Sequence, residues 1–285
     1  MNAKTTILVA GSANVDFVIQ TQTLPRAGET IGGGVFSTVP GGKGANQALA
    51  AQRLGAAVRF AACVGQDAFA DIALSNLIKD GVDISAVSRA ADAATGAAFI
   101  NVSEDGENQI AVASGANAQF APIDVSTLTI DAIIAQLEVS EQSVLETAKS
   151  SDAFLCLNTA PALPVSDALF ARTDLLIMNE TERAFYEAQL RGFQGLIAQT
   201  LGADGAVLTK DGKTVAEAKP PAVNVVDTTG AGDTFTGALV TALMEKQPYD
   251  EALRFACAAG ALATTRLGAQ SAMPSREEVL AVTAT

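Results

Sequence analysis

Short apolar runs alternate with longer amphipathic stretches along most of this chain. Each run has the length and composition of a buried strand, and the stretches between runs space their apolar residues three and four positions apart, as one face of a helix does. The predicted strands span residues 7–10, 58–64, 132–137, 154–157, 175–178 and 206–209. The clearest helices are predicted at 67–79 and 249–265, with a last one after Pro274. This alternation predicts an α/β fold with a central, mostly parallel sheet and helices on both faces.

Two segments do not follow this alternation. Residues 17–39 and 95–112 are rich in β-branched residues and glycine, without a long helical period. In the second segment, Glu104-Asp105-Gly106-Glu107 stands between apolar runs, which is typical of a β-hairpin. We therefore expect a small β-sheet, built from residues of approximately 15–40 and 95–113, beside the main sheet.

The composition narrows the possible partners. Of the 285 residues, 49% are apolar and 17% are charged, and the net charge is −13. So acidic a chain is not attracted to nucleic-acid phosphates or to anionic membranes, and neither partner is expected. There is no histidine, which leaves carboxylates and lysines for proton transfer. Because no repeat or linker divides the chain, a single domain over residues 1–285 is expected.

The apolar runs do not predict export or membrane insertion. Thr5–Ala10 is too short for a signal peptide. The longest late uncharged stretch, residues 255–265, falls short of the roughly 20 residues that a membrane-spanning helix needs. Cys63, Cys156 and Cys257 are odd in number and far apart, which favours free buried thiols in a reducing compartment. We therefore expect a cytoplasmic protein.

Residues 222–243 are the most informative stretch. They predict a strand at 222–226, then a glycine turn, then a helix whose apolar face begins at Phe235. The N–H groups of the turn, Gly230-Ala231-Gly232, can converge on an anion at the helix N-terminus. Asp233 follows at once, and its carboxylate suits a base that faces a hydroxyl group. The alternative is a plain tight turn followed by an acidic residue that stabilises the helix dipole.

Polar side chains also follow the predicted strands, at the end where open α/β sheets bind ligands. They are Asn14 and Asp16 after the first strand, Glu138 after the third, Asn158 after the fourth, and Asn179 and Glu182 after the fifth. Each one alone could be a turn former, and Asn179 with Glu182 also fits a helix capping box. Together they favour a polar site along one edge of the sheet.

Two strings of the chain resemble the paired signatures of the ribokinase (PfkB-type) carbohydrate kinase family. They are Gly41-Gly42-Lys43-Gly44-Ala45-Asn46-Gln47-Ala48 and Asp227-Thr228-Thr229-Gly230-Ala231-Gly232-Asp233-Thr234-Phe235. Both are long, stand in the family's order, and belong to a similarity that covers nearly the whole chain. The resemblance implies a ribokinase-like fold in which the small β-sheet is a lid over a sugar site. It also implies an ATP-dependent phosphotransferase.

The resemblance further implies a role for each matching residue. For catalysis these are Asp233 as general base and the N–H groups of Gly230, Ala231 and Gly232 as an anion hole. For the sugar they are Asn14, Asp16, Gly42, Lys43, Asn46, Glu138 and Asp233, although Lys43 could instead be an exposed loop lysine. For ATP they are Asn179, Thr200, Gly202, Gly205 and Cys257. Magnesium would be held through water by Glu182, and an activating potassium ion by backbone carbonyl groups at Asp227, Thr229, Ala263, Arg266 and Gly268.

The sugar-contacting residues are most similar to those of family members that act on D-ribose. The resemblance therefore implies phosphorylation of the primary 5-hydroxyl of D-ribose to ribose 5-phosphate, by a homodimer that pairs through its lid. Another small sugar or a nucleoside is the nearest alternative substrate, and a non-catalytic sugar-binding regulator is the alternative of a different class. The chain departs from the family at Cys257, where many relatives present a polar residue, and at Ser271-Ala272. It also departs between Glu182 and Thr200, where the segment is short and its expected helix is interrupted by glycines.

Overall fold

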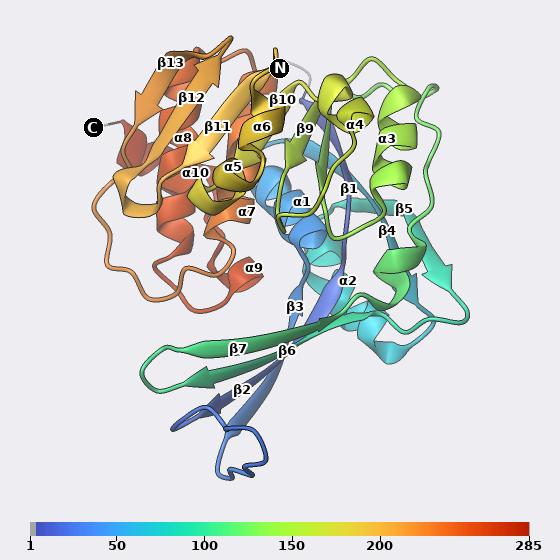
Figure 1. Ribbon diagram of the computed structural model, residues 1–285, viewed down its shortest axis with the longest axis vertical. Coiled ribbons are helices and arrows are strands. Elements are labelled where there is room, and N and C mark those ends of the chain that lie inside the picture. The colour runs from blue at the N-terminus through green and yellow to red at the C-terminus, as the bar shows by residue number, and fades with distance from the viewer. Residues whose placement is uncertain (1–3, 285) are drawn as a thin grey trace.

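A computed structural model describes residues 4–284; residues 1–3 and 285, the ends of the expected single domain, lie outside the described part. Its centre is a nine-stranded sheet with the strand order β13-β12-β11-β10-β9-β8-β1-β4-β5 (Figure 1). Neighbours run parallel from β5 to β11, and β12 and β13 form an antiparallel edge. The strands are β1 (Thr6–Ala10), β4 (Ala57–Gly65), β5 (Asp83–Ala90), β8 (Ala132–Gln136), β9 (Phe154–Asn158), β10 (Leu175–Met178), β11 (Leu196–Thr200), β12 (Ala206–Lys210) and β13 (Lys213–Ala218).

Alternate side chains of the buried strands pack on opposite faces of this sheet. In β1, Ile7 and Val9 join one hydrophobic core, and Leu8 and Ala10 join the other. Helices that cover the first core are α1 (Lys43–Arg53), α2 (Ala68–Lys79), α7 (Ala231–Met244), α8 (Tyr249–Ala263) and α10 (Arg276–Thr283). Helices that cover the second are α3 (Glu141–Lys149) and α4 (Asp167–Arg172). The prediction of a mostly parallel sheet with helices on both faces is confirmed.

A second, four-stranded sheet in the order β3-β2-β6-β7 projects from the main body (Figure 1). Its strands are β2 (Asn14–Thr21), β3 (Val35–Gly41), β6 (Gly96–Ser103) and β7 (Asn108–Ala113). The expected hairpin turn joins β6 to β7, where Gly106 has a φ of 87° and Ser103 N–H donates to the Glu107 carbonyl oxygen at 3.0 Å. Both segments expected to form a separate small sheet therefore do so.

The strand expected at residues 222–226 is wrong. This segment has no regular secondary structure, and Val225 and Val226 are exposed. Pro220 and Pro221 precede it and have no N–H to donate to a neighbouring strand. The turn at Gly230 is therefore reached by an irregular loop that leaves the edge strand β13.

The interrupted helix expected between Glu182 and Thr200 is found, but the sequence did not predict the strand that follows it. The segment forms two short helices, α5 (Glu180–Phe185) and α6 (Glu187–Leu190), and then the strand β11. Leu196 and Ala198 of β11 are buried beside β10, so sheet burial decides the conformation after Gly195. The shortened segment thus still completes the parallel part of the sheet.

Cys63, Cys156 and Cys257 are free and buried, as expected. Within residues 4–284, none of the helices combines the length and the apolar character that crossing a bilayer requires.

Candidate active site

Several predicted polar residues meet at the carboxyl edge of the nine-stranded sheet. Asn14 follows β1, Glu138 follows β8, and Asn158 ends β9. Because β1, β8 and β9 are consecutive in the sheet and parallel, their carboxyl ends lie side by side. The helices α1 and α7 bring Asn46 and Asp233 to the same place, as the hydrogen bond between these two side chains shows.

Glycines allow the N-terminus of α1 to rest on the chain that leaves β1. Gly42, the residue before the helix, has a φ of 90°, in the left-handed region that side chains disfavour. A Cβ on Gly44 would lie 2.5 Å from the backbone nitrogen of Ser12. The Gly-Gly-Lys-Gly string therefore serves close packing, and it places Lys43 and Asn46 beside the strand ends.

Asp16 and Glu138 form an acidic pair on the side of the small sheet. Burial raises the pKa of Asp16 to about 6, and the negative charge of Glu138 adds to the shift. Glu138 Oε2 accepts hydrogen bonds from Ser12 Oγ at 2.5 Å and from the Lys43 N–H at 3.1 Å. Carboxylates accept hydrogen bonds only, so this pair suits a ligand that presents hydroxyl groups.

Asn117, to which no sequence motif draws attention, orients Asn14. It is buried in the 3₁₀ helix η1 (Gly115–Gln119), just after β7. Its Oδ1 accepts a hydrogen bond from the Ala13 N–H at 2.9 Å, so its amino group faces the other way and donates to Asn14 Oδ1 at 2.7 Å. Since Asn14 uses its oxygen for this bond, its own amino group is the part that can donate to a ligand.

Asp233 is buried in the first turn of α7, where this helix meets α1. Asn46 Nδ2 donates to Asp233 Oδ2 and Gln47 Nε2 donates to Oδ1, both at 2.9 Å. Burial raises the pKa of Asp233, and the charge of Lys43 and the two amide hydrogen bonds offset this only in part. A carboxylate that is fixed in orientation and more basic than usual is suited to accept a proton.

Lys43 is half-buried, not the exposed loop lysine of the alternative interpretation. Burial lowers its pKa, but the negative charges of Asp233, Glu138 and Glu182 outweigh burial, and the pKa is raised. The ammonium group therefore stays charged among three carboxylates. It is the positive charge that offsets their mutual repulsion.

The N-terminus of α7 has the geometry expected of an anion site, although one of its N–H groups already donates within the turn. Gly230 has a φ of 78° and precedes the helix, and Gly232 is exposed. The helix is 14 residues long, so its N-terminal end carries the positive pole of a substantial dipole. The Ala231 N–H, however, donates to the Thr228 carbonyl oxygen at 3.2 Å. An anion would have to exchange with this bond to reach all three N–H groups.

A pocket of about 610 Å³ opens beside this helix end. Its lining is mostly apolar, which suits the base of a nucleotide. Four of the residues expected to bind ATP line it, namely Thr200, Gly202, Gly205 and Cys257, together with Ala231 and Gly232 of the turn. Burial raises the pKa of Cys257 to about 12, so this residue is a neutral thiol, and its sulfur lies 3.6 Å from the Ala218 carbonyl oxygen. Asn179 is not part of the lining.

Residues 4–276 match the model of the pfkB family carbohydrate kinases. This chain belongs to that family. A ribokinase of Haemophilus influenzae is 37% identical to it, covering 96% of this chain and 97% of the relative. A deoxyribokinase of Salmonella typhi is 34% identical, covering 95% and 96%. The solved structure of an Arabidopsis thaliana ribokinase complexed with ribose and ATP has a TM-score of 0.89 at 31% identity, covering 98% of this chain and 99% of that one.

In this pfkB carbohydrate kinase, Asn179 and Glu182 form the capping box of α5. Asn179 N–H donates to Glu182 Oε2, and Glu182 N–H donates to Asn179 Oδ1, both at 2.8 Å. The box occupies Oε2 and leaves Oε1 of the buried Glu182 for another partner. Within residues 4–284, no group of three or more acidic, cysteine or histidine side chains is placed so that it could hold a metal ion. Glu182 Oε1 is thus the carboxylate oxygen that could hold a magnesium ion through water.

The two loops expected to hold a monovalent cation are joined through Asp227. Its Oδ1 accepts hydrogen bonds from Thr229 N–H at 2.9 Å and Thr229 Oγ at 2.7 Å, and its Oδ2 accepts one from Gly268 N–H at 2.8 Å. Burial alone would raise the pKa of Asp227, but these bonds outweigh it and the pKa is lowered. Ala263 ends α8 on the same side, and Thr264, next to it, accepts from the Asp227 N–H at 3.1 Å. The structure thus brings together Asp227, Thr229 and Gly268.

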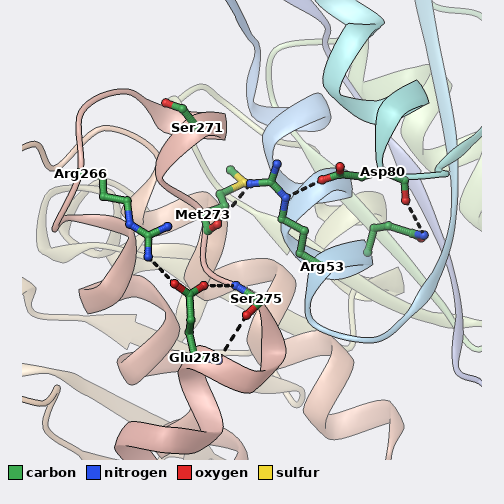
Figure 2. A pocket seen from close by; sticks show the side chains of 8 residues that line it. Arg53, Asp80, Arg266, Ser271, Met273, Ser275 and Glu278 are labelled. Carbon is green, nitrogen blue, oxygen red and sulfur yellow. Dashed lines mark hydrogen bonds and ion pairs between the residues drawn. The ribbon is translucent and has the colours of Figure 1, made fainter.

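Two arginines make the ion pairs on the outer face of the loop that contains Gly268 (Figure 2). There a hollow of about 500 Å³ separates Arg266, which pairs with Glu278, from Arg53, which pairs with Asp80 at 2.5 Å. The Arg266 side chain is therefore committed to Glu278. The Ser271 hydroxyl donates to the Leu267 carbonyl oxygen at 2.7 Å, within its own helical turn.

Gln270, in the short helix α9 (Ala269–Ala272), links this loop to the kinase site. Its Nε2 donates to Asn46 Oδ1 at 3.1 Å, and its backbone oxygen accepts a hydrogen bond from Arg53 at 2.7 Å. Because Asn46 binds Asp233, the loop and the buried carboxylate share a continuous set of hydrogen bonds. The string around Asn46 predicted that residue but not its partner Gln270.

Proposed function

We propose that this protein transfers the γ-phosphoryl group of ATP to the primary 5-hydroxyl of D-ribose and so produces ribose 5-phosphate. The observation that carries the proposal is the position of Asp233. This buried carboxylate lies between the hydroxyl-binding edge of the sheet and the N-terminus of α7, which opens onto the apolar pocket. Ribokinases among the relatives, one of them solved with ribose and ATP, support the choice of substrates.

The sugar would lie between the strand ends and the small sheet. Asp16 accepts hydrogen bonds from two neighbouring hydroxyls, a pairing that one carboxylate makes well. The amino group of Asn14 donates to the same hydroxyl-rich ligand, because Asn117 occupies its oxygen. Glu138 accepts a further hydroxyl, and the Gly42 backbone, Asn46 and Lys43 complete the sugar site.

Phosphoryl transfer requires the protein to align donor and acceptor and to neutralise charge. The 5-oxygen of the sugar attacks the γ-phosphorus while Asp233 accepts the hydroxyl proton. The bond from the γ-phosphorus to the bridging oxygen breaks, and ADP leaves. The N–H groups of Gly230, Ala231 and Gly232 stabilise the negative charge in transit, and Ala231 exchanges its bond to Thr228 for this role.

The nucleotide would bind with its base in the apolar pocket. Thr200, Gly202, Gly205 and Cys257 line the pocket on the side of β11, β12 and α8. Asn179 lies outside the lining and would act on the phosphates, through its bond to Glu182. The neutral thiol of Cys257 donates its S–H to the Ala218 carbonyl oxygen, so it offers the base only a weakly accepting sulfur where many relatives present a polar residue.

Two cations would assist. Magnesium, held through water by Glu182, supplies charge neutralisation of the ATP phosphates when bound. Potassium, held through backbone carbonyl oxygens of Asp227, Thr229, Ala263, Arg266 and Gly268, would brace the loop before the glycine turn against the loop that follows α8. These loops are already joined by the Gly268-to-Asp227 hydrogen bond, which supports a shared binding site.

We further propose that the chain acts as one domain whose small sheet is a lid that excludes water during transfer. The lid face that carries Asp16 also exposes Val35, Val39, Ile110 and Val112, and such an apolar surface suits pairing with a second copy of the chain. Its three free thiols suit the cytoplasm, where ATP is available.

The test is ATP consumption with magnesium and potassium against D-ribose, 2-deoxyribose, fructose, ketodeoxygluconate, adenosine and pseudouridine. We expect strong turnover with D-ribose. The deoxyribokinase relative makes 2-deoxyribose the second candidate, and a higher kcat/KM with that sugar would replace ribose as the substrate. Turnover with a nucleoside alone would overturn the sugar but keep Asp233, and no turnover with any compound would favour a non-catalytic regulator.

A further inference from the structure

Buried amide side chains form a series of hydrogen bonds that begins at Asp233. A backbone carbonyl group fixes the direction of donation along this series. Asn158, at the end of β9, donates from Nδ2 to the carbonyl oxygen of Ile177 at 3.1 Å. Because a carbonyl oxygen can only accept, Asn158 must turn its Oδ1 toward Gln47. Gln47 Nε2 donates to this oxygen at 3.0 Å and to Asp233 Oδ1 at 2.9 Å.

The opposite orientation of the Gln47 amide is excluded by these neighbours. Turned over, its Oε1 would face two other acceptor oxygens, those of Asn158 and Asp233, in place of two hydrogen bonds. Gln47 has an exposed fraction of 0%, so water cannot relieve such contacts. The amino group of Gln47 must therefore point at Asp233.

Gln136 shows that this direction of donation is kept although it leaves one buried atom without a hydrogen-bond partner. Its Nε2 donates to Gln47 Oε1 at 2.6 Å. Its own Oε1 is, among the described residues, the one buried side-chain polar atom without a hydrogen-bond partner. A Cβ on Gly11 would lie 2.0 Å from this oxygen, so only glycine leaves room for it. Native cores rarely leave such an atom unpaired, and an exception points to a constraint on the group that it serves.

We propose that Gln47 is a positioning residue for phosphoryl transfer, which holds the Asp233 carboxylate ionised and turned toward the acceptor hydroxyl. The inference rests on the proposed role of Asp233 as the base. Asn158 acts through Gln47, since it sets the orientation of that amide. Each Asp233 oxygen has two lone pairs and gives one to an amide, so one on each remains for the hydroxyl proton.

The other groups that face Asp233 do not duplicate this role. Asn46 binds the opposite oxygen, Lys43 lowers the pKa of Asp233, and Glu138 raises it. The hydrogen bond from Gln47 also lowers that pKa. Its loss therefore leaves Asp233 protonated at a higher pH than in the wild type, and a protonated carboxyl group cannot act as the base.

The experiment measures kcat and KM across about pH 5 to 9, with ATP, magnesium and D-ribose. The variants are Gln47→Met, which keeps the side-chain length without a donor, and Asn158→Leu, which removes the anchor of the amide. Gln52→Met is the matched control, because Gln52 lies on the same helix but bonds only to the backbone of Val58, Asp80 and Gly81.

For Gln47→Met we expect kcat to fall about 10- to 100-fold near neutral pH, the effect of losing a hydrogen bond to a charged group. The KM for ribose should stay within about threefold, and the acid limb of the kcat profile should move to higher pH. Asn158→Leu should move the limb in the same direction by a smaller amount. Gln52→Met should lower thermal stability at most and leave the limb in place.

An acid limb that stays in place in both Gln47→Met and Asn158→Leu would overturn the inference, whether or not kcat falls. If Gln47→Met does not fold, Asn158→Leu and the isosteric Gln47→Glu take its place. The second carboxyl group that Gln47→Glu introduces should raise the pKa at which the pair loses its last proton, and so move the limb further still. The turnover rate of the wild type distinguishes failure of the proposed function from failure of the proposed role of Gln47. Absence of ribose turnover in the wild type refutes the proposed function, whereas wild-type turnover with unmoved limbs refutes only the role of Gln47.

Discussion

Asp233 is surrounded by groups with opposing effects on its proton. Burial favours the protonated form, while Lys43 and the amides of Asn46 and Gln47 favour the carboxylate. If Asp233 is the base, Asp233→Asn should lower kcat about 10²- to 10⁴-fold. Ribose affinity, measured by calorimetry without ATP, should change much less than kcat. Near-normal turnover by this variant would remove Asp233 from the mechanism.

Asp16 should make sugar binding depend on pH. Its pKa of about 6 lies above the ordinary aspartate value, because the site is buried and Glu138 is near. If Asp16 binds the sugar as proposed, its carboxylate form accepts the hydroxyls, so affinity for D-ribose should be constant above pH 6 and fall about tenfold per unit below it. Calorimetric titrations in several buffers should also detect proton release on binding near pH 6. The Asp16→Asn variant should bind D-ribose weakly and with little dependence on pH. A fall in affinity below pH 6 that persists in this variant would be due to another titrating group.

The residues that the sequence could predict stand in two continuous strings and at strand ends. The residues that it could not predict act through partners far away in the chain. Gln47 and Asp233 are 186 positions apart, Asn117 and Ala13 are 104 apart, and Gln270 and Asn46 are 224 apart. No local pattern records which amide faces which carboxylate, because that pairing depends on how α1, α7 and the strand ends pack.

At the scale of elements, apolar runs predicted the strands that are buried on both faces. They failed at the edge strand β5, at the short interior strand β11, and where proline intervenes. The edge strand β5 is only half-buried and lacks a continuous apolar run. Residues 222–226 have the run but no neighbouring strand to pair with after Pro220 and Pro221. The presence of a neighbouring strand to pair with, and not local propensity, decides that β5 forms a strand and that residues 222–226 do not.

The close packing of α7 on α1 should depend on Gly237. A Cβ there would lie 2.8 Å from the Ala51 nitrogen and 2.9 Å from the Ala50 Cβ. Alanine normally favours a helix over glycine by about 1 kcal/mol. Here we expect Gly237→Ala to lower the free energy of unfolding by about 1–3 kcal/mol, because backbone atoms cannot move aside.

The same substitution should also lower kcat, since it moves Asp233 away from Asn46 and Gln47 on the facing helix. Denaturant unfolding and steady-state kinetics measure the two effects. Gly192→Ala is the control, because a Cβ at this position meets no atom within 4 Å. Unchanged stability of Gly237→Ala would show that the two helices can separate without loss.

At the scale of the whole molecule, the lid carries an apolar surface that the main body does not cover. On the face that includes Asp16, Ile110 is 57% exposed and Val112 is 59% exposed. An uncovered sheet face of this kind would also leave the proposed sugar site open on one side, so pairing through it would shield both the apolar residues and the sugar. The proposed homodimer thus connects oligomeric state with the site.

Light scattering after size-exclusion chromatography tests this connection. We expect the wild type to have twice the 29.0 kDa mass of one chain, and Ile110→Glu to have the mass of one chain, since a buried unpaired charge opposes association. Ile78→Glu is the matched control, because Ile78 is 56% exposed on α2 of the main body, and this variant should remain a dimer.

The Ile110→Glu monomer should have a raised KM for D-ribose and a nearly normal KM for ATP. The reason is that the lid faces the proposed sugar site, whereas the nucleotide pocket is lined by α7 and α8. A wild-type monomer with full activity would show that one lid closes the site alone.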